Sequence, residues 1–163
     1  MAALVLFGGG GDLAMRMLLP SLYFLEHDGL LPDGLKIIGA ARSDESRDDY
    51  VAKVRVSVEG KARADDSWSD DAWTRMEARL DYLAVDATSA ASLKPLKDKV
   101  GAGACTSFLA VSPSLYARIV TAMRAAGLAE ADDRVVLEKP VGRDLERFRE
   151  IDDAVADAFS EQQ

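Results

Sequence analysis

The sequence lacks the residues on which several classes of protein depend. It contains one cysteine, Cys105, and one histidine, His27, among 163 residues. A single cysteine excludes a disulfide within the chain, and the two residues together exclude a zinc site built from several cysteines or histidines. We therefore expect no metal site, and we interpret Cys105 as a buried strand residue and His27 as a residue near a helix end.

Basic residues are also scarce. The 20 lysines and arginines are outnumbered by 28 aspartates and glutamates, which gives a formal net charge of −8. A nucleic-acid backbone requires a basic stripe, and an anionic membrane attracts basic chains. We therefore expect neither nucleic acid nor membrane as a partner, although a local basic pocket for a phosphate stays compatible with this composition.

Long apolar runs are missing as well. No segment reaches the roughly 18 apolar residues of a membrane span. The opening segment 1–7 lacks the basic start and small-residue cleavage site of a signal peptide. Together with the unpaired cysteine, these features favour a cytoplasmic location.

The composition is that of a folded domain. Hydrophobic residues make up 48% and charged residues 29% of the chain, which is unlike a disordered protein. A chain of this length corresponds to about one domain and can bury about 70% of its unfolded surface. We therefore expect residues 1–163 to form a single domain.

Short apolar runs alternate with segments of helical periodicity. The runs predict strands at 2–7, 35–41, 80–85, 104–111 and 134–138. The periodic segments predict helices at 12–28, from 46 past 58, at 71–79, from 89, from 112 past 123, and at 145–159. Strands separated by helices, with both sheet faces covered, indicate an α/β fold with a doubly wound, mostly parallel sheet of the Rossmann type.

Local signals predict how individual helices begin and end. Ser46 and Asp49 resemble a capping box, and Ser112 before a proline is typical of an N-cap. The polar segment 60–70 reads as a loop, and Pro95 predicts a split or irregular helix. In the first helix, Leu18, Leu22 and Leu25 occur at helical spacing and predict its apolar face.

A glycine-rich turn joins the first strand to the first helix. Its residues are Gly8, Gly9, Gly10, Gly11, Asp12, Leu13 and Ala14. A turn without side chains lets the backbone approach a pyrophosphate, and the helix N-terminus offers free N–H groups to it. The turn departs from strict G-x-G-x-x-G, so a flexible connection stays the alternative to a phosphate cradle. We expect Asp12 to stabilise the helix start and to have no catalytic role.

Two further strand ends carry candidate ligand contacts. The second strand ends in Arg42 and Ser43, and an arginine at this point accepts the 2′-phosphate of NADP. The alternative is an ordinary surface arginine, and Asp44 could still contact a ribose. Lys139 follows the fifth strand, where it could contact cofactor and substrate together, with Pro140 fixing the turn.

These motifs together resemble the N-terminal coenzyme domain of glucose-6-phosphate dehydrogenase. That family has a GASGDLA-like loop, a K-L-x-P-S-L-Y helix, a D-G-L-L-P segment, A-R-S after the second strand and a later E-K-P-F-G element. Here the glycine turn is followed by Leu-Leu-Pro-Ser-Leu-Tyr at 18–23, Asp-Gly-Leu-Leu-Pro at 28–32 and Ala-Arg-Ser at 41–43. The resemblance runs in the family's order from Leu4 to about Phe159.

The resemblance implies both an activity and a set of cofactor contacts. It implies oxidation of glucose 6-phosphate by NADP to 6-phosphogluconolactone, in the oxidative pentose phosphate pathway. It places the glycine turn at the pyrophosphate and Arg42 with Ser43 at the 2′-phosphate. It further places Asp86 and Ala87 near the adenosine, Ala110 within a Phe-Leu-Ala-Val-Ser-Pro segment at the nicotinamide, and Lys139 at both cofactor and substrate.

The sequence also departs from the family. Met17 stands where the family has a lysine that helps to hold the sugar phosphate, Ser112 replaces a proline, and Val141 replaces a phenylalanine. The sequence ends at Gln163, where the family continues into a second domain that holds the catalytic histidine and the subunit contacts. We therefore expect no catalytic residue in this chain, glucose 6-phosphate binding and oligomerisation only through that second domain, and no turnover by residues 1–163 alone.

Two other interpretations stay open. One is the cofactor domain of an enzyme of the glucose–fructose oxidoreductase type, which also has Glu-Lys-Pro after its fifth strand. The Asp-Leu-Ala after the glycines and the 28–32 segment argue against it. The other is a non-catalytic paralogue that binds a dinucleotide or a partner protein.

Overall fold

The computed structural model describes residues 2–163 and contains a five-stranded parallel sheet in the order β3-β2-β1-β4-β5. The strands are β1 (Ala3–Phe7), β2 (Lys36–Ala41), β3 (Leu80–Ala84), β4 (Cys105–Leu109) and β5 (Arg134–Leu137). Each strand lies within one or two residues of a segment for which the sequence predicts a strand. The α/β fold with a parallel sheet is therefore confirmed.

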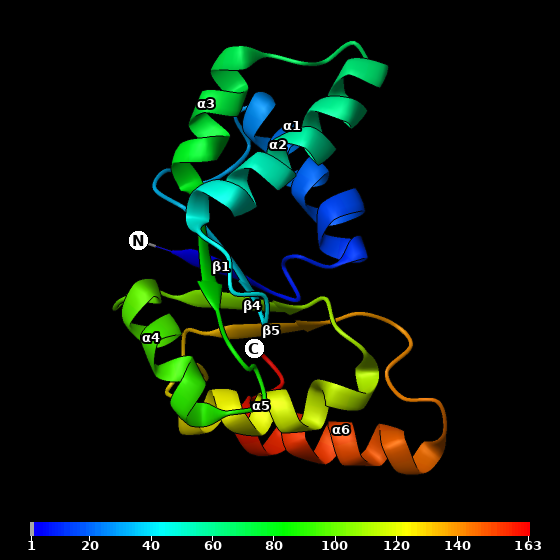
Figure 1. The fold of residues 1–163 in the computed structure, drawn as a ribbon. Helices are drawn as coiled ribbons and strands as arrows, with labels where there is room; N and C mark the ends of the chain where they lie inside the picture. The colour runs from blue at the N-terminus through cyan, green and yellow to red at the C-terminus, as the bar shows by residue number, and fades with distance from the viewer. Residues whose placement is uncertain (1) are drawn as a thin grey trace.

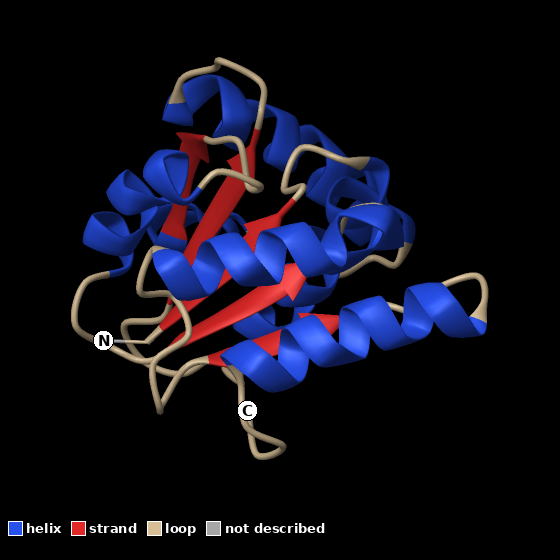
Figure 2. Cartoon of the chain, turned by 90° about the horizontal axis from the view of Figure 1, so that it is seen from below, coloured by secondary structure: helices blue, strands red, loops and turns tan. Residues whose placement is uncertain are grey.

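Helices cover both faces of the sheet (Figures 1 and 2). On one face lie α1 (Leu19–His27), α2 (Arg47–Ala64) and α3 (Asp70–Arg79), and on the other lie α4 (Ala90–Val100), α5 (Tyr116–Ala125) and α6 (Leu145–Ala158). A π-helical turn (Ala14–Leu18) leads into α1, and a 3₁₀ turn (Pro113–Leu115) leads into α5. Figure 2 looks at the side on which α4, α5 and α6 lie in front of the strands.

Alternating side chains of the strands supply two separate cores. In β1, Val5 and Phe7 pack with residues of α4, α5 and α6, whereas Leu6 packs with residues of α1, α2 and α3. Successive side chains of a strand point to opposite faces of the sheet. A strand covered on both faces must therefore be apolar throughout, which explains the uninterrupted apolar runs of the sequence.

The order of the strands reverses beside β1. Phe7, at the end of β1, pairs with Ala40 of β2 on one side and with Leu109 of β4 on the other. The chain winds outward from β1 to β2 and β3, then returns to β4 and β5 on the other side. All five carboxyl ends therefore lie along one edge, and the switch between β1 and β4 is where open α/β sheets bind ligands.

The apolar face that the sequence predicts for the first helix is confirmed only in part, since Leu18 and Leu22 pack against the core and Leu25 does not. Leu25 is 39% exposed, and the side that packs inward carries Leu19, Tyr23 and Glu26. Leucine spacing alone misses part of the buried face, because one buried position is Glu26. A hydrophobicity pattern assigns a carboxylate to the exposed side of a helix.

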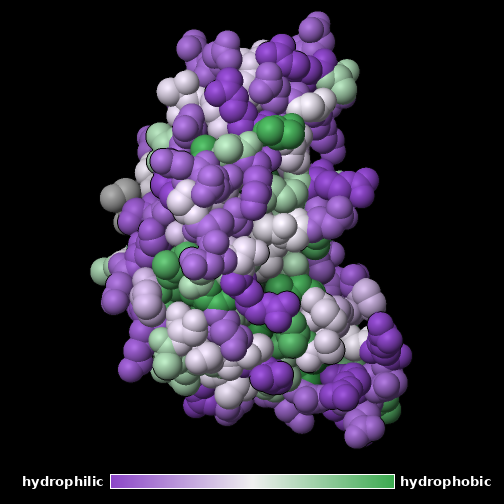
Figure 3. Space-filling model, in the orientation of Figure 1, coloured by the Kyte–Doolittle hydropathy of each residue, from purple (hydrophilic) through white to green (hydrophobic). Residues whose placement is uncertain are grey.

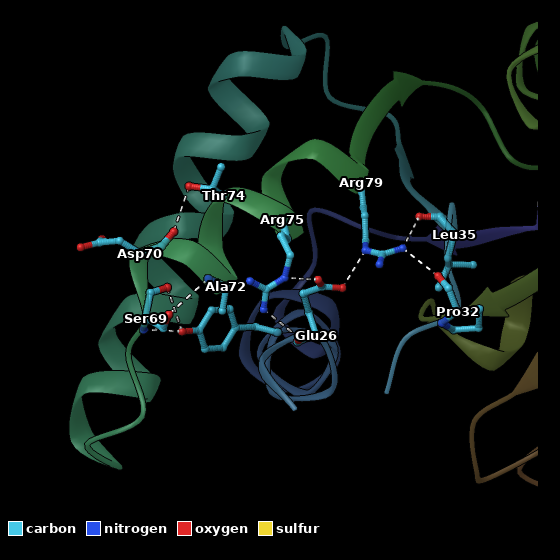
Figure 4. A network of polar contacts seen from close by, with 10 residues as sticks. Glu26, Pro32, Leu35, Ser69, Asp70, Ala72, Thr74, Arg75 and Arg79 are labelled. Atoms are coloured by element: carbon cyan, nitrogen blue, oxygen red, sulfur yellow. Dashed lines mark hydrogen bonds and ion pairs between the residues drawn. The ribbon is translucent and has the colours of Figure 1, made fainter. Parts of the chain in front are cut away.

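Two arginines make the burial of Glu26 favourable (Figure 4). Arg75 Nε and Arg79 Nε of α3 lie 2.9 and 2.7 Å from the two carboxylate oxygens of Glu26. Arg79 also donates a hydrogen bond of 2.9 Å to the carbonyl oxygen of Pro32. A buried carboxylate is tolerated when it is paired and hydrogen-bonded in this way, so the network anchors the end of α1 to α3.

Two predictions about helix limits need correction. Helix α2 continues through Ala64, so the predicted loop 60–70 shrinks to a short connection before α3. Ala62 is buried, and the Glu59–Arg63 ion pair spans one turn, so the polar composition hid a helix end. Pro95 does not split α4, because Leu93 and Leu96 stay packed on the core side.

The predicted caps differ in outcome. Ser46 accepts a hydrogen bond from the backbone N–H of Asp49, which confirms the start of α2. Ser112 occupies the N-cap position of the 3₁₀ turn before α5, with Pro113 in the first turn, but its hydroxyl makes no capping bond and bonds instead to the hydroxyl of Ser114.

The surface view in Figure 3 is largely hydrophilic, with small separate apolar patches. None of the helices within residues 2–163 is long and apolar enough to cross a membrane.

Candidate functional site

The sequence-predicted residues gather along the carboxyl edge of the sheet. Gly8 follows β1, Arg42 follows β2, Asp86 lies just beyond β3, Ala110 follows β4, and Lys139 lies just beyond β5. The parallel register aligns these strand ends, for example Ala41 with Ala84 and Leu109 with Leu137. Segments far apart in the sequence thus form one continuous rim.

The first two glycines are required by the packing of the strands. Gly8 has a φ of +79°, and a Cβ at this position would lie 2.5 Å from the carbonyl oxygen of Ala110. A Cβ on Gly9 would lie 2.7 Å from the Cα of Gly39. The backbone N–H of Gly8 also donates a 2.8 Å hydrogen bond to Ala40. The loop is therefore clamped between the ends of β2 and β4.

The next two glycines differ from the first two. Gly10 is exposed, and a Cβ there would meet only Glu45 Oε1, at 3.9 Å. Gly11 donates its backbone N–H to the carbonyl oxygen of Gly8 at 2.8 Å. This bond closes the turn and leaves Gly10 at its open tip.

Free backbone donors follow this tip. In the part of the chain that the structure describes, the N–H groups of Gly10, Asp12, Leu13 and Ala14 donate to no backbone carbonyl, and no side chain caps the π-helical turn. The first intrahelical bond is donated by Met15 to Gly11. Unpaired N–H groups at the start of a helix make a cradle for an anion.

Two buried tyrosines, which the sequence did not reveal as site residues, donate hydrogen bonds to the backbone of this rim. The Tyr50 hydroxyl donates a hydrogen bond of 3.3 Å to the carbonyl oxygen of Gly9, and the Tyr82 hydroxyl donates one of 2.7 Å to the carbonyl oxygen of Ser43. Their ring centroids are 4.7 Å apart. Burial raises the pKa of each hydroxyl above its usual value, so both stay protonated donors. No sequence motif marks these residues, because both lie on apolar faces.

Arg42, Ser43 and Asp86 form the exposed part of the rim beyond β2 and β3. Hydrogen bonds from the backbone and side chain of Thr88 hold the pKa of Asp86 below its usual value, and the charges of Arg118 and Arg42 lower it further. Ala87 beside it packs against the core. Arg42 and Asp86 are both exposed, so their side chains face solvent at this part of the rim.

The rim beyond β4 and β5 is built differently. Ala110 donates its backbone N–H to Phe7 at 2.9 Å, which ties the end of β4 to the end of β1. Lys139 is exposed and precedes a cis peptide bond to Pro140. The hydroxyl of Tyr116 donates to the carbonyl oxygen of Glu138 at 3.2 Å, so the backbone before Lys139 is held.

A cavity of about 540 Å³ opens between these two strand ends and α6. Its walls come from the segments 112–117 and 140–151 and include Ser112, Ser114, Arg143 and Arg147. Lys139 is not among its lining residues but precedes Pro140, which is. The cavity therefore continues the rim at the end where the family resemblance places the nicotinamide.

The remaining candidates lie away from this rim or are buried. His27 ends α1 and its ring lies 2.9 Å from the carboxylate of Asp28. Cys105 is buried in β4, and burial raises the pKa of its thiol to about 11. Among residues 2–163, no group of three or more His, Cys, Asp or Glu side chains is placed to hold a metal ion.

Comparisons with known proteins point to one family. The family model for "Glucose-6-phosphate dehydrogenase, NAD binding domain" matches residues 5–163. Glucose-6-phosphate 1-dehydrogenase of Zymomonas mobilis is 38% identical over 99% of this chain and 34% of its own, and that of Mycolicibacterium smegmatis is 36% identical over 98% and 33%. The chain thus spans about a third of the length of the curated relatives that it matches.

Solved structures agree with these matches. The crystal structure of glucose-6-phosphate 1-dehydrogenase from Mycobacterium avium superposes with a TM-score of 0.88 and 33% identity, covering 98% of this chain and 34% of that one. A glucose-6-phosphate dehydrogenase in complex with its substrate glucose 6-phosphate gives a TM-score of 0.83 and 28% identity, with the same coverage.

Proposed function

The chain belongs to the family of the glucose-6-phosphate dehydrogenase NAD-binding domain, and on that premise we propose that it binds NADP along the carboxyl edge of its sheet. The observation that carries this proposal is the glycine turn. Gly8 and Gly9 are clamped, Gly10 is open, and unpaired N–H groups follow it at the start of a helix. This arrangement fits a pyrophosphate, because the glycines place no side chains of their own between it and the backbone.

The other rim residues take their roles from their positions. Arg42, exposed after β2, would hold the 2′-phosphate with charge-assisted hydrogen bonds, and Ser43 follows it in the chain. Asp86 and Ala87 would border the adenosine, and Ala110 would border the nicotinamide. Lys139 is exposed at the same rim and would contact both cofactor and substrate. When bound, the nicotinamide ring accepts the hydride.

For the whole protein we propose the activity for which its relatives are named, that of a glucose-6-phosphate 1-dehydrogenase. The reaction would be the oxidation of glucose 6-phosphate by NADP to 6-phosphogluconolactone, as the first step of the oxidative pentose phosphate pathway in the cytoplasm. Residues 1–163 would form its single NADP-binding domain. The substrate site and the subunit contacts would require the part of the relatives that this chain does not span.

We further propose that residues 1–163 do not turn over on their own. Removal of the proton from the sugar hydroxyl requires a base within hydrogen-bond reach of that oxygen. His27 lies at the far end of α1 from the glycine turn, beside Asp28. Lys139 next to phosphates would stay protonated and act as a clamp. A mixture of residues 1–163, glucose 6-phosphate and NADP should form no NADPH above the blank, and robust formation would contradict this proposal.

A calorimetric titration tests the cofactor assignment. The chain should bind NADP more tightly than NAD, and Arg42→Ala should reduce that preference about 10-fold or more, because it removes charge-assisted hydrogen bonds of about 1.5–3 kcal/mol. Arg124→Ala removes an exposed arginine from the last turn of α5, at the opposite end of that helix from the rim, and serves as the matched control. An unchanged NADP-to-NAD ratio in Arg42→Ala would remove Arg42 from the site.

A further inference from the structure

Glu45 is a carboxylate held beside the glycine turn, although it follows three exposed residues. Only 9% of its side chain is exposed, and Lys53 Nζ of α2 lies 2.5 Å from its Oε2. Its other oxygen, Oε1, lies 3.9 Å from the position of a Cβ built on Gly10. The carboxylate therefore borders the open tip of the turn, three residues beyond Arg42.

Two buried tyrosines, Tyr50 and Tyr82, lie on the inner side of this carboxylate. It faces the hydroxyl of Tyr82, whose pKa is raised first by burial and then by the negative charge of Glu45. The pKa of Tyr50 is also raised, first by burial, then by Tyr82 and then by the negative charge of Glu45. Lys53 is 60% exposed, so it approaches Glu45 from the solvent side. Glu45 is thus a largely buried charge, whereas the arginine at the same strand end is exposed.

We infer that Glu45 is a specificity-determining residue that opposes Arg42 in the choice between dinucleotides with a free ribose 2′-hydroxyl and dinucleotides with a 2′-phosphate. A carboxylate at the end of the second strand accepts hydrogen bonds from ribose hydroxyls and repels a phosphate, whereas an arginine does the reverse. This chain carries one of each at the same strand end. The inference rests on the proposed binding of a nicotinamide dinucleotide.

Lys53 sets how strongly Glu45 acts. Its ammonium group neutralises the carboxylate that borders Gly10 and therefore reduces the repulsion of a 2′-phosphate. Loss of Lys53 would leave Glu45 as an uncompensated negative charge at the rim. The two residues are therefore expected to shift cofactor preference in opposite directions, which a purely structural ion pair would not do.

The test measures dissociation constants for NADP and for NAD with the wild-type chain and single variants. Glu45→Gln keeps the shape and removes the charge, and it should shift the preference toward NADP by about 10-fold. Lys53→Met should shift it toward NAD. Asp48→Asn, which removes a carboxylate that is 92% exposed on the first turn of α2, controls for net charge and should leave the ratio within about two-fold.

Each result separates the inference from the proposal beneath it. If the wild-type chain binds neither dinucleotide, the proposed function fails. If it binds but Glu45→Gln changes both affinities equally, Glu45 is structural and the inference is overturned. If Asp44→Asn moves the ratio instead, the exposed neighbour is the determinant and the inference is also overturned. Should Glu45→Gln fail to fold, the direction of the Lys53→Met shift decides.

Discussion

The two ends of the carboxyl rim differ in how they are held. The glycine-loop end, formed by the ends of β1, β2 and β3, is held by Gly8 against Ala110 and by the hydroxyls of Tyr50 and Tyr82. The β5 end, formed by the residues after β5 and the start of α6, has no buried residue in its strand and exposes Leu145 and Phe148. These contacts fix the backbone of the glycine-loop end, whereas the β5 end exposes apolar side chains to solvent.

This difference follows from the position of the strands in the sheet. β1 and β2 have neighbours on both sides, and the edge strand β3 is tied to the residues after β2 by the Tyr82–Ser43 hydrogen bond, whereas β5 at the other edge pairs only with β4. Backbone groups in the middle of the sheet are therefore fixed before any ligand binds. This difference supports the proposal that the glycine-loop end is preformed to bind the adenosine and pyrophosphate part of a dinucleotide, while the β5 end is less constrained.

The largest effect is expected at Glu26, the buried carboxylate at the end of α1 that lies away from the glycine turn. Glu26→Gln leaves Arg79, whose side chain is 16% exposed, without its counter-charge, and should lower the free energy of unfolding by about 3 kcal/mol. The exposed Arg147–Glu150 pair at the β5 end provides the contrast, and Glu150→Gln should leave the urea midpoint unchanged. Equal shifts in the two variants would contradict the distinction between the buried and the exposed ion pair.

The next effect separates the packed glycine from the open one. Gly8→Ala forces a Cβ against Ala110 at positive φ and should cost about 2 kcal/mol of stability. Gly10→Ala has room and should keep the stability within about 0.5 kcal/mol. Gly10→Ala should instead weaken NADP binding, because its methyl group enters the proposed phosphate cradle. Thermal unfolding and calorimetry of both variants measure this, and a reversed pattern would contradict the account.

A smaller effect is expected at the tyrosine below the glycine turn. Tyr50→Phe removes the hydrogen bond to Gly9 and should cost about 1 kcal/mol of stability, together with a several-fold loss of NADP affinity. Tyr23→Phe serves as the control, because its buried hydroxyl lies away from the rim. That hydroxyl accepts a hydrogen bond from the backbone N–H of Ser69 and donates one to the carbonyl oxygen of Ser67. It should cost similar stability and no affinity. If both variants bind NADP as the wild type does, Tyr50 does not position the turn.

Much of this fold could be predicted from the sequence because strands and helices have distinct hydrophobic periods. The apolar runs located all five strands, and the Ser46–Asp49 pair located the start of α2. Predictions were wrong where a polar residue was buried or a polar segment was helical. The buried Glu26 made part of the inner face of α1 unrecognisable from hydrophobicity, and the polar end of α2 resembled a loop.

The candidate site divides in the same manner. Strand-end positions such as Gly8, Arg42 and Lys139 follow from the parallel topology, so the sequence could place them on one rim. Glu45, Tyr50 and Tyr82 could not be found, because their role depends on contacts between α2 or β3 and the glycine turn. Such contacts join segments about 40 residues apart and leave no local pattern.

The central claim is that the glycine turn presents its free N–H groups to a dinucleotide. The most direct test is a titration of the ¹⁵N-labelled chain with NADP, followed by amide chemical shifts. The account predicts saturable shifts at Gly10, Asp12 and Leu13, with Gly10→Ala weakening the response. Shifts confined to the cavity residues of 140–151, or no saturable shift in the glycine turn, would contradict it.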